Sequence, residues 1–229
     1  MLGTALLALG ITGAVAGGLG DRGSIKDGPQ AAPTPVWSGL YVGAGIGYGS
    51  GSTRFHNSDP SSIPFGEIFN VSIGGTQGVL AVGYDFQLSP KWVLGLFADY
   101  AFGDIEGNVV CPGGGCDQTY TIENQWAVGG RLGFLATPST LFHVSAGYTA
   151  AEWTELIKFH PGLKTAPTTR ELDLEGYFLG VGVEQALNRN LSFKLDYRFT
   201  DHGLEQPSIA KLNNDVHSIR AGINYRFGQ

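Results

Sequence analysis

Leu191–Thr200 reads LSFKLDYRFT, and apolar and polar side chains alternate along its whole length. Because successive side chains of a strand point to opposite faces, this segment predicts a β-strand with one apolar and one polar face. The apolar face carries Leu191, Phe193, Leu195, Tyr197 and Phe199, and the polar face carries Ser192, Lys194, Asp196, Arg198 and Thr200.

Seven further segments repeat this alternation, so we expect eight strands in all. The pattern is clear in the segments that run from Trp92 to Gly103, Gln125 to Phe134 and Ser218 to Phe227, and it is weaker in those that begin near Leu40, Gly78, Phe142 and Tyr177.

The connections between these segments alternate in length. Long polar stretches occupy residues 51–76, 104–119, 154–171 and 201–215, whereas short turns occupy residues 88–91, 136–140 and 188–190. Outer-membrane barrels have long external loops and short periplasmic turns. We therefore predict an all-β fold, an eight-stranded antiparallel transmembrane up-and-down β-barrel with both chain ends in the periplasm.

Aromatic residues on the apolar face fall at two heights of this barrel. Such rings collect where a barrel meets the lipid headgroups, and a soluble sandwich predicts no such rows. The expected outer row includes Tyr48, Tyr100, Trp126 and Tyr177, and the expected periplasmic row includes Tyr84, Trp92, Phe134, Tyr225 and Phe227.

The composition agrees with a membrane barrel and excludes other classes. The 229 residues include 36 Gly, and only 15% of the residues are charged, which is low for a soluble surface. The formal net charge is -6, whereas a nucleic-acid binder usually carries an excess of basic residues. We expect no nucleic-acid partner, and the sequence leaves the oligomeric state open.

The N-terminal region reads as an export signal. Residues 1–11 are MLGTALLALGI, and Ala14 and Ala16 supply the small residues that signal peptidase accepts, although no basic residue precedes the apolar run. We predict a signal peptide over residues 1–16, a polar Pro-containing periplasmic lead-in over 17–36 and the barrel over 37–229.

The two cysteines, Cys111 and Cys116, are separated by a Pro-Gly-Gly-Gly stretch without His. A disulfide that closes this loop is favoured over a metal site, which would need three or four ligands. Two free thiols are the alternative. A disulfide implies an oxidising compartment.

The polar face places a nearly balanced set of charges inside the barrel. Eight strands enclose a space that side chains can fill, so we expect a packed polar interior, with a narrow diffusion channel as the alternative. If Leu187 and Leu191 flank a short turn, Glu184 lies opposite Lys194. The expected interior charges are Asp85, Asp99, Arg131, Glu184, Lys194, Asp196, Arg198, Arg220 and Arg226.

Glycine rows in the first and fourth segments have two interpretations. Gly43, Gly45 and Gly47, with Gly129 and Gly133, would suggest a phosphate loop only if a helix followed. We instead expect these glycines to make room for Arg and Lys side chains of neighbouring strands.

A lipid A-modifying enzyme is a distant alternative function. Some small outer-membrane barrels deacylate lipid A with a His and a Ser that lie two residues apart on an outward face. His143 and Ser145 have this spacing, but both are expected to face inward, away from the lipid. His217 and Ser218 are adjacent, so they face opposite ways. We therefore predict no catalytic residues.

External residues give no ligand motif. Exposed groups are expected at Arg54, Phe55, His56, Lys158, His160 and Lys164. A metal ion shared by His56 and His160 is not expected, because the two lie on separate loops. We predict no cofactor and no metal site.

Several stretches resemble a known family. Trp37–Gly51 (WSGLYVGAGIGYGSG), Trp92–Tyr100 (WVLGLFADY), Gly180–Tyr197 (GVGVEQALNRNLSFKLDY) and His217–Phe227 (HSIRAGINYRF) resemble the porin-like outer-membrane proteins of alphaproteobacteria called outer-membrane immunogenic proteins. The similarity extends over nearly all of the chain after Val36 and includes GSIKD at residues 23–27. It implies an eight-stranded barrel in outer-membrane lipid and lipopolysaccharide, inserted by the barrel assembly machinery. That machinery reads an aromatic last strand, whereas here Gly228 and Gln229 follow Phe227.

Overall fold

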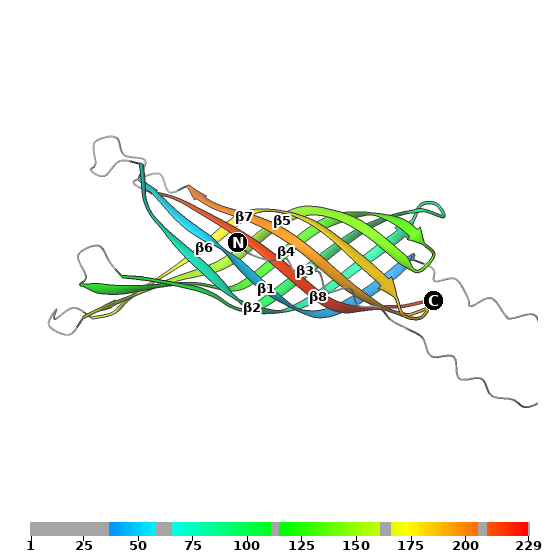
Figure 1. The fold of residues 1–229 in the computed structure, drawn as a ribbon, viewed down its shortest axis with the longest axis horizontal. Helices are drawn as coiled ribbons and strands as arrows, with labels where there is room; N and C mark the ends of the chain where they lie inside the picture. Colours follow the sequence, from blue (N-terminus) through cyan, green and yellow to red (C-terminus); the bar gives the residue numbers. More distant parts are fainter. Residues whose placement is uncertain (1–36, 58–65, 111–114, 161–165, 206–209, 229) are drawn as a thin grey trace, which may run out of the picture. The chain divides into compact units, whose positions relative to one another are not determined.

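The computed structural model describes residues 37–57, 66–110, 115–160, 166–205 and 210–228. Eight strands form one closed antiparallel barrel in which each strand pairs with its neighbours in sequence and β8 pairs with β1 (Figure 1). The predicted fold class is confirmed. The strands are β1 Gly39–Asn57, β2 Gly66–Gln87, β3 Trp92–Val110, β4 Cys116–Thr137, β5 Thr140–Phe159, β6 Thr168–Ala186, β7 Leu191–Glu205 and β8 Ala210–Arg226.

No helix among the described residues is long and apolar enough to span a membrane.

The strands are staggered around the barrel. Following directly paired residues once around, from Tyr41 across β2 to β8 and back to β1, leads to Gly51, a stagger of ten residues (51 against 41). A stagger of this kind tilts the strands and brings residues far apart in sequence to one level of the lumen. The contacts inside the barrel follow from this geometry.

The strands are much longer than the segments in which the sequence shows clear alternation. Most of the stretches expected to be long loops, including residues 66–76, 104–110, 116–119 and 154–159, continue the paired strands. The loop prediction was wrong because polar side chains on an outward face are found both in loops and in strands that extend into water. The short turns lie where expected, between β2 and β3, β4 and β5, and β6 and β7.

The outward face of the barrel carries a belt of exposed apolar side chains. The residues predicted for the two aromatic rows all lie on this face, at 39% exposure or more. Leu96, Leu132 and Leu195 are among the aliphatic residues between them. A tall outward apolar band flanked by aromatic rows is the surface that a barrel presents to lipid.

The strands continue beyond one aromatic row, and we call this part the extension. Its outward face is polar: Glu106, Glu123, Glu152 and Asp173 are all exposed. The opposite end of the barrel, which holds the three short turns, is called the turn end. The extension comprises residues 50–57, 66–76, 103–110, 116–125, 149–159, 168–176, 201–205 and 210–217.

Candidate functional site

The lumen is the candidate functional site, and its turn end is closed by Trp37. This residue precedes β1, is fully buried, and packs with Val93, Leu135 and Leu141. Its indole Nε1 donates a hydrogen bond to the carbonyl of Pro138 at 2.9 Å. Trp37 therefore fills the mouth between the ends of β3, β4 and β5, a role that the sequence did not indicate.

Above Trp37 lies a balanced group of four charges, which we call the lower charge layer. It consists of Asp85, Arg131, Glu184 and Arg226, all buried. Arg131 donates from Nε to Asp85 at 2.9 Å and from Nη1 to Glu184 at 2.8 Å. Arg226 also pairs with Asp85. Two arginines and two carboxylates thus neutralise one another.

Neutral side chains complete the lower charge layer. Ser192 and Asn224 donate hydrogen bonds to Oε1 of Glu184, the latter at 3.0 Å. The guanidinium carbon of Arg131 lies 4.8 Å from the centre of the Tyr41 ring, and that of Arg226 lies 5.0 Å from Trp37. These contacts hold the arginine planes in place.

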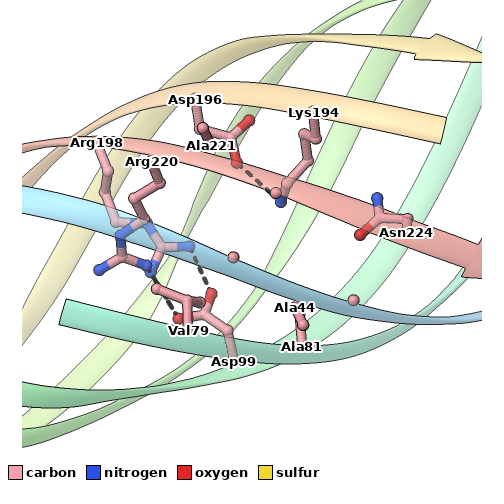
Figure 2. A pocket seen from close by; sticks show the side chains of 13 residues that line it. Ala44, Val79, Ala81, Asp99, Lys194, Asp196, Arg198, Arg220, Ala221 and Asn224 are labelled. Atoms are coloured by element: carbon pink, nitrogen blue, oxygen red, sulfur yellow. Dashed lines mark hydrogen bonds and ion pairs between the residues drawn. The ribbon is translucent and has the colours of Figure 1, made fainter.

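The upper charge layer, defined as Asp99, Lys194, Asp196, Arg198 and Arg220, lies toward the extension. Arg198 and Arg220 both pair with Asp99, and Lys194 pairs with Asp196 at 2.8 Å (Figure 2). His143 Nε2 lies 3.0 Å from Asp196. Three formal cations face two carboxylates here.

The register of β6 and β7 confirms that Glu184 lies opposite Lys194, but the two side chains do not form an ion pair. Glu184 pairs with Arg131, while Lys194 pairs with Asp196. Cross-strand neighbours predict proximity only. Glu184 takes its partner from β4 across the lumen, whereas Lys194 pairs with the residue two positions along its own strand β7.

The glycine rows make room inside the barrel, though only in part for cationic side chains. A Cβ at Gly47 would lie 2.9 Å from Cγ of Arg220, as expected. At Gly43, Gly129 and Gly133 the side chains in the way are instead Asn224, Phe178 and Leu141.

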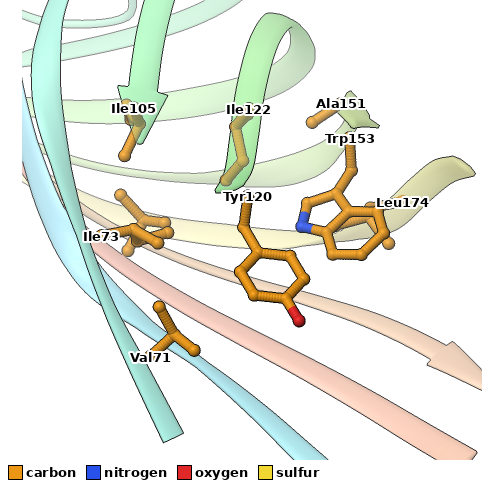
Figure 3. Packing of buried hydrophobic residues seen from close by; sticks show 9 residues of the cluster. Val71, Ile73, Ile105, Tyr120, Ile122, Ala151, Trp153 and Leu174 are labelled. Atoms are coloured by element: carbon orange, nitrogen blue, oxygen red, sulfur yellow. The ribbon is translucent and has the colours of Figure 1, made fainter. Parts of the chain in front are cut away.

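Inside the extension a group of apolar side chains, which we call the apolar cluster, fills part of the lumen, beside buried polar side chains such as Thr53, His202 and Asn214. Trp153 and Tyr120 stack with ring centres 5.4 Å apart, and the other side chains surround them (Figure 3). Tyr120 donates a hydrogen bond to Gln118 at 2.7 Å. Burial and the neighbouring Glu155 raise the pKa of the Tyr120 hydroxyl. The buried members are Val71, Ile73, Ile105, Tyr120, Ile122, Ala151, Trp153, Leu174 and Val216.

The polarity of the wall is therefore inverted between the two parts of the barrel. In the belt, apolar residues face out and charges face in, whereas in the extension Glu152 faces out and Trp153 faces in. The packed polar interior was expected for the strands of the belt, where the charges do face in, whereas most of the extension was expected to be loops. Its outer face is polar, so apolar side chains are left to fill part of the lumen.

The residue pairs considered for an enzyme do not form a lipid-facing site. His143 is buried in the lumen and paired with Asp196. His217 faces out, with Nδ1 2.6 Å from the Tyr197 hydroxyl, while its neighbour Ser218 is buried. Among the described residues, no group of three or more His, Cys, Asp or Glu is placed to hold a metal ion.

Several predicted surface residues lie on the strands of the extension. Arg54 of β1 pairs with Asp215, and His160 lies 3.2 Å from Asp117. Lys158 is exposed near the end of β5. The side chains of Phe55 and His56, and all of Lys164 and Cys111, lie outside the described residues. Cys116 is buried at the start of β4.

Comparison with known proteins points to one family. The sequence model of one protein family, the outer membrane protein β-barrel domain, matches residues 28–227. The chain is 27% identical over 213 residues to the 31 kDa outer-membrane immunogenic protein of Brucella melitensis, with 87% of this chain and 88% of that protein covered.

Two solved structures share the fold. Neisserial surface protein A aligns with a TM-score of 0.50 and 16% identity, covering 83% of this chain and 98% of that one. The outer membrane protease OmpT from Escherichia coli aligns with a TM-score of 0.51 and 10% identity, covering 82% and 97%. At these identities the likeness concerns the fold alone.

Proposed function

Since this chain belongs to the family of the outer membrane protein β-barrel domain, we propose that it is a structural or porin-like component of the bacterial outer membrane whose lumen is closed. The observation that carries this proposal is the filling of the lumen at successive levels. Trp37, the two charge layers and the apolar cluster each occupy it. The proposed interaction surface is the outward polar face of the extension.

We propose that the turn end faces the periplasm and the extension faces the exterior. Short periplasmic turns and longer external parts are the rule for such barrels. The apolar belt then contacts lipid, and the exposed carboxylates of the extension lie among lipopolysaccharide headgroups. The aromatic last strand, which ends near Phe227, is proposed as the signal read by the barrel assembly machinery.

Two measurements test the closed lumen. Protein from the outer-membrane fraction should migrate differently in boiled and unboiled samples, because a closed barrel resists detergent until it is heated. The unboiled protein should then give no stable openings in planar bilayers, since ion-paired side chains fill the lumen. A boiled sample is the control. Stable, reproducible openings would favour the narrow diffusion channel instead.

Export and the disulfide are proposed from the sequence and tested by one intact-mass measurement. The mature protein should lack residues 1–16, because signal peptidase accepts the small residues before that point. In denaturant, alkylation should add mass at Cys111 and Cys116 only after reduction, since a disulfide protects both thiols. The variant Cys111→Ser should be alkylated at Cys116 without reduction. Labelling of the unreduced native protein would contradict the disulfide.

A further inference from the structure

The upper charge layer carries an excess positive charge, unlike the lower one. Lys194, Arg198 and Arg220 face only Asp99 and Asp196 within the layer. His143, the second partner of Asp196, is neutral or adds a further positive charge. Arg198 and Arg220 are buried, and an unbalanced charge beside them is costly, so a counter-charge is expected at this level.

Arg220 is the arginine of this layer with the fewer hydrogen bonds to Asp99. Asp99 receives two hydrogen bonds from Arg198, at 3.0 Å and 2.5 Å, but one from Arg220, at 3.2 Å. Only 6% of the Arg220 surface is exposed, and its Nε has no hydrogen-bond partner among the described residues. One guanidinium donor is therefore left for another ligand.

A cavity of about 30 Å³ lies beside these groups. Lys194, Arg198 and Arg220 line it together with Asp99 and Asp196, and Figure 2 shows the arginine pair and the Lys194–Asp196 pair around the intervening space. Gly43, Gly45 and Gly222 form part of the wall and leave the space open. A volume of this size accepts a water molecule or one monatomic ion but no polyatomic solute.

We propose that this cavity binds a small monovalent anion of the size of chloride. The two carboxylates do not oppose it, because each is already occupied by two basic groups. The anion neutralises the excess cation and accepts the hydrogen bond from Nε of Arg220. This proposal goes beyond the structural role proposed above, since a closed lumen needs no ligand.

The test uses the folded protein in detergent micelles at one ionic strength, with sodium chloride, bromide or gluconate. Gluconate is too large for the cavity, so the midpoint of the heat-induced band shift should be roughly 3 °C higher in either halide. The variant Arg220→Met should lose this difference, because without the Arg220 charge the upper charge layer holds two cations and two carboxylates. It should still fold, because Arg198 remains on Asp99. The control Arg189→Met, at an exposed turn residue, should keep the difference.

Crystals grown in sodium bromide give a second measurement that does not depend on the variant. An anomalous bromide peak between Lys194 and Arg220 would support the site. Equal midpoints in all three salts without such a peak would overturn it and leave a water in the cavity. A halide effect that persists in Arg220→Met would assign the effect to another part of the protein and also overturn the proposal.

Discussion

Replacing Glu184 with alanine is expected to lower the free energy of unfolding by about 3–5 kcal/mol. Glu184 is fully buried and accepts hydrogen bonds from Arg131, Ser192 and Asn224. Its removal leaves Arg131 and Arg226 with Asp85 as the only carboxylate of the lower charge layer. Both guanidinium groups are buried, so the native state bears the cost of the uncompensated charge. Urea unfolding in detergent micelles measures the loss.

Two variants separate this effect from the loss of any carboxylate. Glu171→Ala removes an exposed carboxylate from the same strand and should change stability by less than about 0.5 kcal/mol. Glu184→Gln keeps the side-chain shape and should give an intermediate loss. None of the three variants should conduct ions in planar bilayers, because the lumen is closed at other levels as well. A Glu184→Ala barrel as stable as the wild type would show that the ion pairs are dispensable.

Trp153→Ala is expected to destabilise the extension by about 3–5 kcal/mol, as large-to-small changes in a well-packed core do. Trp153 is 2% exposed and stacks on Tyr120 at the centre of the apolar cluster. The loss should be local, because Trp153 packs within the apolar cluster of the extension. Faster amide hydrogen exchange and earlier protease cleavage in the extension should report it, while the belt strands keep their protection.

Trp126→Ala is the matched control, since it is the same substitution on β4 at an outward position. Trp126 is 45% exposed and contacts Tyr148 on the lipid-facing surface. Its loss should leave hydrogen exchange in the extension unchanged. Equal effects of the two substitutions would contradict an apolar core inside the extension.

The strand number and the facing of most residues follow from local sequence. In Leu191–Thr200 every predicted outward side chain is more exposed than its inward neighbours, with Phe193 at 42% and Ser192 at 4%. Alternation is a property of a single strand, so ten residues suffice to reveal it. The same reasoning failed for residues 104–110 and 154–159, because polar residues on an outward face are common both to loops and to strands in water.

The sequence by itself thus determined an eight-stranded membrane barrel, its two aromatic rows and the set of charges that face inward. Only the tertiary structure decided which charges meet. Arg131 pairs with Asp85, Arg198 with Asp99, and Arg226 with Asp85, from separations of 46, 99 and 141 residues. Barrel closure and a ten-residue stagger bring these strands to one level, and neither property is encoded within a single strand.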